Sequence, residues 1–211
     1  RECNAFNQNI GGWNTGNVED MRYMFYGAEA FNQPIGTWNV SKVANMFRMF
    51  DSAIIFNQNI NAWNVGNVTS MSFMFDAATA FNQPLNSWNV SSVIDMRFMF
   101  YQASVFNQDI SSWNVSSVTD MEGVFYQAFP FNQDLSSWDV SNVIDMERIF
   151  NSTSLSTTNY DAILNGWSAL TVQPNVPFGT GTIPYSAAGA AAHNTLTSAP
   201  NSWIITDGGQ V

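Results

Sequence analysis

The sequence predicts a repeat solenoid of six 25-residue coils, residues 1–150, followed by a C-terminal capping segment, residues 151–211. The first observation is that Phe-Asn-Gln recurs every 25 residues, without an insertion or deletion. The second is that a tryptophan stands at a fixed distance after each Phe-Asn-Gln. The third is that the apolar pattern changes within each repeat. A period of this length is typical of stacked arrays, whose units are too small to bury their apolar faces alone.

The start of each repeat predicts a short strand. In Phe6-Asn7-Gln8-Asn9-Ile10 the large apolar residues alternate with polar ones, as they do in a half-buried strand. Stacked copies would pair in parallel, about 4.8 Å apart. Pro34 and Pro84 argue against an ideal ladder at this position, because proline has no amide proton to donate.

The second half of each repeat predicts a short helix or 3₁₀ return. From Val18 the apolar residues follow at steps of three and four, through Met21 and Phe25 to Ala28. Between the two halves, Asn14 to Asn17 have the composition of a turn. An aspartate precedes the methionine in four repeats, where we expect it to place negative charge at a helix N-terminus. These residues are Asp20, Asp95, Asp120 and Asp145.

Two rows of identical residues predict a structural ladder. Large apolar side chains favour stacking by about 25 cal/mol per Å² of buried surface. A repeated asparagine can bond the turn backbone and its own copy in the next coil. The rows are Asn7, Asn32, Asn57, Asn82, Asn107 and Asn132, and Trp13, Trp38, Trp63, Trp88, Trp113 and Trp138. A ligand-binding role for the asparagine row is the alternative.

The segment 151–211 predicts an α/β cap for the open end of the array. Several N-cap candidates precede a helix expected over 161–170. A loop rich in proline, glycine and threonine follows over 173–184. An alanine-rich helix is expected over 185–199, and a strand and turn over 203–209.

Composition excludes several classes of partner. The chain has 6 basic and 16 acidic residues, a formal charge of −10, so neither nucleic acid nor an anionic membrane surface is expected to bind. No apolar run approaches the 18 or so residues of a membrane span, so membrane insertion is not expected. Cys3 is the single cysteine, so no disulfide forms within the chain. The sequence begins inside a repeat, and we therefore expect it to belong to a longer polypeptide.

The stretch FNQDISSWNVSSVTDMEGVFYQA, residues 106–128, resembles the repeat of BspA-type leucine-rich-repeat surface proteins. The resemblance covers residues 1–150, and the closing segment is similar to the one that commonly ends such arrays. It implies a leucine-rich-repeat-like solenoid, exposed at a cell surface or secreted, and associated with adhesion to host or matrix proteins. It offers no catalytic residues.

The positions that the repeat leaves free predict a binding stripe. They scatter aromatic residues and arginines over a surface that should be polar, and such residues are enriched in binding hot spots. The stripe contains Tyr23, Tyr26, Phe47, Phe73, Phe98, Tyr101 and Tyr126. We expect it to recognise an extracellular protein or glycan. The alternative is that these aromatics pack against the neighbouring coil.

Enzyme chemistry finds little support. His193 is the single histidine, and neither a nucleophile elbow nor a phosphate-binding glycine loop is present. No cofactor is expected, although the aspartate row leaves calcium open as an alternative, broken by Asn45 and Ser70. The sequence therefore predicts a non-enzymatic, adhesin-like binding module, extracellular or at the cell surface. The other reading is a purely structural spacer, stalk or subunit of an extracellular assembly.

Overall fold

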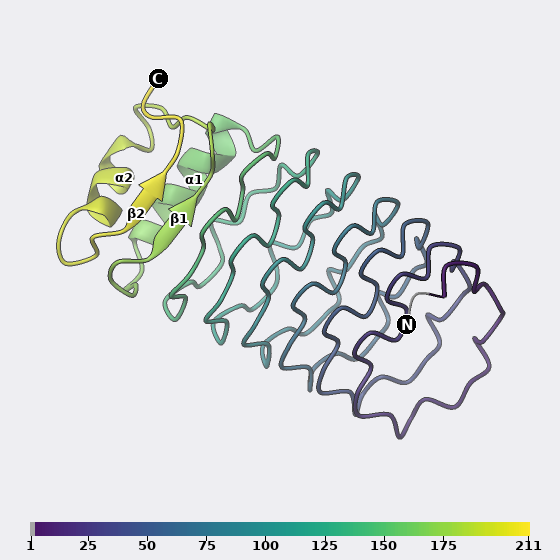
Figure 1. Cartoon of the computed structure of the whole chain (residues 1–211). Coiled ribbons are helices and arrows are strands. Elements are labelled where there is room, and N and C mark those ends of the chain that lie inside the picture. The colour runs from purple at the N-terminus through teal and green to yellow at the C-terminus, as the bar shows by residue number, and fades with distance from the viewer. Residues whose placement is uncertain (1–2) are drawn as a thin grey trace.

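The computed structural model describes residues 3–211 of the chain. The repeats follow one another as successive loops of chain, and the C-terminal segment lies at one end of this array (Figure 1). Within residues 3–211 the helices and strands all lie in that C-terminal segment. They are α1 (Thr157–Ser168), β1 (Pro177–Gly179), α2 (Ala190–Thr197) and β2 (Ile204–Thr206). None of the helices in this range is long and apolar enough to span a bilayer.

Backbone hydrogen bonds join the repeats through one part of each unit, residues 20–27 and their equivalents, which we call the ladder segment. The amides of Met21, Tyr23 and Phe25 donate to carbonyls of the next repeat at 2.9–3.0 Å. Isolated parallel bridges mark the start of each ladder segment, beginning with Asp20 to Asn45. Alternate peptide groups therefore point along the array, each N–H toward the following repeat.

The helix or 3₁₀ return predicted for this segment is wrong. The residues form consecutive turns, closed by bonds such as Met24 N to Met21 O at 3.2 Å and Ala28 N to Phe25 O at 3.0 Å. Positive φ angles at Tyr23 (60°) and Gly27 (65°) interrupt any right-handed helix. The turns nevertheless advance by three and four residues, so Met21, Phe25 and Ala28 point inward as they would from a helix.

The strand predicted at Phe-Asn-Gln is also wrong, because residues 6–10 and their equivalents form no strand. The repeats are joined there by side chains. Asn7 Oδ1 accepts hydrogen bonds from the Asn32 amide at 3.1 Å and from Gln33 Nε2 at 2.9 Å. The same pair of bonds recurs in the following repeats. Pro34 is tolerated because no backbone ladder requires an N–H donor at this position.

Stacked aromatic rings fill the core. The ring centroid of Phe25 lies 4.1 Å from that of Phe31 and 5.3 Å from that of Phe50, and both ring pairs are nearly parallel. Trp38 and Trp63 stack 6.5 Å apart, within 1° of parallel. The Trp38 Nε1–H also donates to the Ile10 carbonyl of the preceding repeat at 3.2 Å. The predicted asparagine and tryptophan ladders are therefore present, and each asparagine side chain of the first five repeats bonds both the backbone amide of its own copy and the glutamine side chain of the next repeat.

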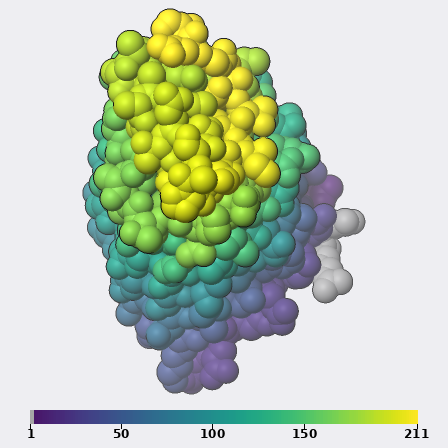
Figure 2. Space-filling view, turned by 90° about the vertical axis from the view of Figure 1, so that its left-hand side faces the viewer, coloured from purple at the N-terminus to yellow at the C-terminus, as the bar shows by residue number. Residues whose placement is uncertain are grey.

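The C-terminal segment reproduces these contacts against the sixth repeat. Trp167 of α1 donates to the Leu135 carbonyl at 3.1 Å, as the tryptophans of the second to sixth repeats do to the unit before them. The Ser156 amide donates to Asn132 Oδ1 at 2.8 Å and so ends the asparagine ladder. The Met146 amide donates to the Pro177 carbonyl at 2.9 Å, which extends the backbone ladder onto β1. Figure 2 shows the segment 151–211 covering the end of the array.

Two of the elements differ from their predicted ranges. The loop expected over 173–184 contains β1, which pairs in parallel with β2. The alanine-rich helix is shorter than expected, because α2 begins only after Gly189. A Cβ at Gly189 would lie 2.4 Å from Asp161 Oδ1 of α1, so the absence of a side chain allows the close approach of the two elements. The helix and strand predicted over 161–170 and 203–209 correspond to α1 and β2.

Candidate functional site

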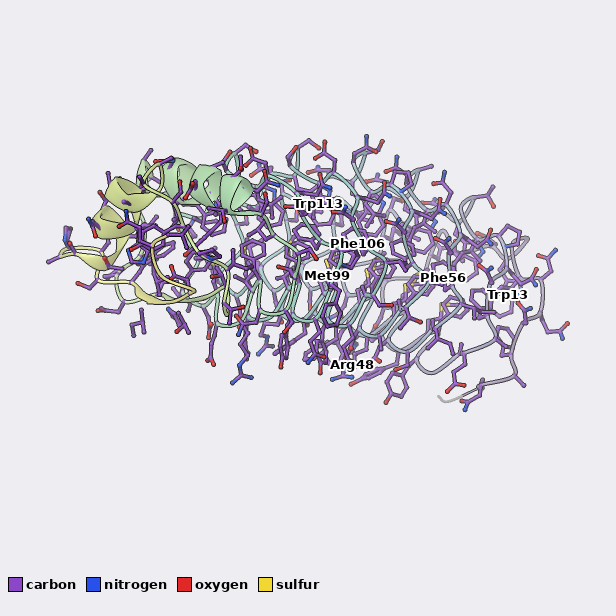
Figure 3. The ribbon with its side chains drawn as sticks, turned by 90° about the horizontal axis from the view of Figure 1, so that it is seen from above. Trp13, Arg48, Phe56, Met99, Phe106 and Trp113 are labelled. Carbon is purple, nitrogen blue, oxygen red and sulfur yellow. The ribbon has the colours of Figure 1, made fainter. Side chains whose placement is uncertain are left out.

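The seven aromatic residues predicted as a stripe come together on the ladder segments. Each is half-buried, and each ring contacts the next along the array. The ring contacts run Tyr26–Tyr23–Phe47–Phe73–Phe98–Tyr101–Tyr126, with centroids 5.0–5.9 Å apart. We call these seven residues the aromatic row. In Figure 3 Arg48, which contacts this row, lies at one margin of the array, and Trp113 lies toward the opposite one.

Most ring faces in the middle of the aromatic row are covered. Arg48 Cζ lies 4.2 Å from the centroid of the Phe73 ring. Phe98 stacks on Phe73 at 5.0 Å, and Tyr101 stacks on Tyr126 at 5.1 Å within 10° of parallel. The packing alternative left open by the sequence therefore applies to these residues, and their role in binding stays a prediction. Their rings pack against neighbouring repeats, and their remaining surface faces solvent.

Left-handed backbone conformation sets the direction of several of these side chains. Tyr23, Phe73 and Phe98 have φ angles of 60°, 57° and 52°, which are rare for bulky residues. Gly123 occupies the equivalent position in the fifth repeat, with φ of 59°. A Cβ on Gly123 would lie 2.4 Å from the Phe98 ring, so glycine there leaves room for that ring to fold over the next repeat.

Two carboxylates lie beside the centre of the aromatic row, and sequence reasoning missed their importance. Asp51 is 3% exposed, pairs with Arg48 and accepts a hydrogen bond from Ser52 Oγ at 2.8 Å. Burial raises its pKa. Asp76 is half-buried, and its carboxylate accepts no hydrogen bond from any residue in 3–211. Burial, reinforced by the charge of Asp51, raises the pKa of Asp76 to about 7. The available signal was a charge at a position that three other repeats fill with tyrosine.

The predicted role of the aspartate row is also corrected. Because no helix begins there, these side chains instead close a small turn with the amide two residues later. Asp20, Asp95, Asp120 and Asp145 accept from Arg22, Arg97, Glu122 and Glu147 at 2.8–3.0 Å. Asn45 does the same for Phe47 at 2.9 Å, so the position needs an acceptor oxygen rather than a charge. Across residues 3–211 no three His, Cys, Asp or Glu side chains are grouped to hold a metal ion.

The other sequence candidates have structural contacts. Each asparagine of the ladder already accepts two or more hydrogen bonds, as Asn132 does from Ser156 and Asn159. His193 stacks on Tyr185 at 4.3 Å, and its Nε2 lies 3.3 Å from Asp207 Oδ2. Tyr160 donates to the same oxygen at 2.7 Å, and burial raises the pKa of its hydroxyl. These contacts place the histidine in the packing of the C-terminal segment.

A hollow of about 350 Å³ lies where the ladder reaches β1 and β2. Its walls include Glu147, Arg148 and Asn151 from the sixth repeat and Phe178 and Ile204 from the strands. Arg148 is paired with Glu147 at 3.0 Å. The Asn151 Oδ1 atom is buried and has no hydrogen-bond partner within residues 3–211.

These features define a repeat protein, whose units are joined by backbone and side-chain ladders and carry an aromatic row on one face. Residues 1–103 and 85–173 match the family described as "Mycoplasma protein of unknown function, DUF285". Together the two matches span more than half of the chain, so the protein belongs to this family. Comparisons with curated proteins and with solved structures give no match.

Proposed function

We propose that the protein is a non-enzymatic, adhesin-like binding module, extracellular or at the cell surface, that recognises a protein or glycan through the aromatic row. We also propose that its array is a leucine-rich-repeat-like solenoid of the BspA type. The observation that carries the binding role is the aromatic row itself, in which seven rings from five repeats are in continuous contact on one face.

Physical reasoning supports a binding role for this face. Aromatic and arginine side chains supply large contact areas at low cost in conformational entropy, because their neighbours already hold them in place. Here the packing of Phe73 between Arg48 and Phe98 fixes three such side chains before any partner arrives. The stiff array beneath them would present a partner with a preorganised surface.

The test is a binding screen against matrix proteins and glycans. It compares the intact chain with a Tyr101→Ala/Phe98→Ala variant and with a control, Phe129→Ala/Ile144→Ala. The control removes large exposed side chains, 62% and 61% exposed, that lie outside the aromatic row. We expect saturable binding that the row variant loses and the control keeps. Equal binding by all three proteins would remove the role proposed for the row.

One observation favours the second candidate, a structural spacer or stalk. The covered ring faces show that the aromatic row also stabilises the contact between repeats, at about 0.5–1.5 kcal/mol per ring pair. If this were its whole role, the row variant would lower the melting temperature, and no screened protein or glycan would bind the intact chain.

A further inference from the structure

The surroundings of Asp76 indicate the chemical class of the partner that the aromatic row would bind. This inference rests on the proposed function, in which the row is a binding site. Asp51, Asp76 and Tyr101 occupy the same position in three consecutive repeats. Phe73 belongs to the same turn as Asp76, whose amide donates to the Phe73 carbonyl at 3.2 Å. Asp76 therefore lies beside Phe73 in the middle of the row, and its charge acts on Tyr101 of the next repeat, whose pKa is raised by burial and by this charge.

Charge around Asp76 is not balanced within the chain. Arg48 pairs with Asp51, Arg22 pairs with Asp20, and Arg97 pairs with both Asp95 and Asp120. Among residues 3–211, no cationic side chain pairs with Asp76. The Arg48 guanidinium thus pairs with Asp51 alone, and the neighbouring Asp76 is half-buried without a hydrogen-bond donor. Such a carboxylate favours a cation brought by a ligand, because a new ion pair would offset its desolvation.

The covered rings argue against a sugar as the occupant. A sugar stacks on an open aromatic face, whereas both Arg48 and Phe98 lie against the Phe73 ring. Tyr101 is likewise stacked on Tyr126. The row also offers tyrosine hydroxyls and the unpaired carboxylate of Asp76. Extended polypeptide with long basic side chains fits these groups, since an aliphatic stem can lie along ring edges while its charged end reaches the carboxylate.

We propose that the aromatic row binds a basic polypeptide segment and that Asp76, beside Phe73 and Tyr101, receives a lysine or arginine side chain of that segment. The formal charge of −10 supports the same partner, because it attracts cationic chains over long range and repels anionic ones.

Binding of a cation at Asp76 would depend on pH in a defined direction. The charged and titratable groups that act on Asp76 are Asp51, which raises its pKa, and Arg48, which lowers it; Asp76 in turn raises the pKa of Tyr101. With a pKa of about 7, the free carboxyl is largely protonated at pH 6 and largely ionised at pH 8. A bound cation favours the ionised form, so binding would tighten by about tenfold over this range and release a proton.

The experiment titrates the full chain with decalysine, by calorimetry at pH 6 and pH 8. It compares the intact protein with Asp76→Asn and with a matched control, Asp109→Asn. Both substitutions remove one negative charge. Both also introduce a residue found at the equivalent position of another repeat, Asn151 for Asp76 and Asn59 for Asp109. Asp109 lies on the Phe-Asn-Gln side and is exposed. We expect Asp76→Asn to weaken binding by about tenfold at pH 8 and to abolish the pH dependence. The control should change binding by less than about twofold.

Two results would overturn the basic occupant. One is equal weakening by Asp76→Asn and Asp109→Asn, which would show attraction to overall charge only. The other is no saturable binding of decalysine by the intact chain. Failure of the binding role is measured separately, with the Tyr101→Ala/Phe98→Ala variant on any protein or glycan found in the screen. If a screened partner no longer binds that variant but still binds Asp76→Asn, the proposal that the aromatic row is a binding site stands. The proposal that its partner is a basic segment is then overturned.

Discussion

At the scale of the residue, left-handed backbone recurs at two positions of each repeat. The second of them holds Gly27 in the first repeat, with φ of 65°, and Ala77 in the third, with φ of 51°. An L-residue in this conformation costs roughly 1–2 kcal/mol relative to a right-handed one, whereas glycine has no Cβ to clash. The chain therefore accepts local strain in order to keep alternate peptide groups pointing along the array.

This strain predicts that Ala77→Gly stabilises the protein. Relief of the left-handed strain exceeds the entropy that glycine adds to the unfolded chain, and we expect the free energy of unfolding to rise by up to about 1 kcal/mol. Urea denaturation followed by tryptophan fluorescence measures it. Ala103→Gly is the control. Ala103 is fully buried and does not have a positive φ angle, so the same substitution there should lower the free energy of unfolding. Loss of stability in Ala77→Gly would contradict the prediction.

The raised pKa of Asp76 predicts how stability changes with pH. Its value in the unfolded chain is 3.8, and burial raises it to about 7 in the folded chain. Between these values the folded state holds a proton that the unfolded state has released, so the free energy of unfolding falls as pH rises. Asp76→Asn should make this decline shallower, as measured by urea denaturation between about pH 4.5 and pH 6.5.

Asp109→Asn is the control for this experiment as well. A hydrogen bond from Ser111 lowers the pKa of Asp109, so any contribution it makes is present above pH 3.8 and is lost below it. The substitution should leave the decline at higher pH unchanged. Identical slopes for the intact chain and for Asp76→Asn would show that Asp76 does not titrate in this range.

At the scale of the element, α1 stabilises the end of the array because it supplies the last aromatic ring of the stacked core. The Trp167 ring lies 6.5 Å from Phe150, and its Nε1–H donates to the Leu135 carbonyl. β1 likewise continues the backbone ladder from Met146. Both elements therefore cover apolar and polar groups of the sixth repeat that would otherwise be left open.

The contact of α1 predicts that Trp167→Phe costs about 1–2 kcal/mol of unfolding free energy, since one buried hydrogen bond and part of a ring are lost. The Leu135 carbonyl keeps its bond from the Trp138 amide at 3.0 Å, which limits the cost. Trp13→Phe is the matched control, because Trp13 is 56% exposed and stacks on one side only. Equal effects of the two substitutions in urea denaturation would contradict this account of α1.

At the scale of the whole molecule, stability should be graded along the array. Each interior repeat is stacked on both sides, and its tryptophan is 1–4% exposed. The first repeat has a described neighbour on one side only, with Trp13 and Met24 exposed at 56% and 36%. The C-terminal end is covered by the segment 151–211 (Figure 1). Neighbour contacts dominate the stability of such arrays, so the two ends should differ.

This grading predicts the order of amide hydrogen exchange. Ladder amides of the third and fourth repeats, such as Phe75 and Phe100, should exchange more slowly than the equivalent Phe25, by about tenfold or more. All three donate to the next repeat at 2.8–2.9 Å, so the hydrogen bonds themselves are matched. Mass spectrometry of peptic fragments measures the difference. Uniform exchange along the array would instead indicate a single cooperative unit.

Much of this arrangement could be predicted from the sequence, because it depends on repetition. The 25-residue period determined which residues recur at equivalent positions, and identical residues such as Trp38 and Trp63 stack in register. Steps of three and four determined that Met21, Phe25 and Ala28 share an inward face. Variation at the remaining positions was enough to select the seven members of the aromatic row.

Only the tertiary structure determined the backbone conformation of the repeats and the pairing of their charged side chains. Helices and consecutive turns share the same steps of three and four, so the sequence pattern could not separate them. Bonds from each repeat to the next decided in favour of turns, since Tyr23 N to Phe47 O joins residues 24 apart. The same holds for β1, which forms because Met146 and β2 lie beside it. The unpaired state of Asp76 depends on where Arg48 points, and that is set by packing between repeats rather than by local sequence.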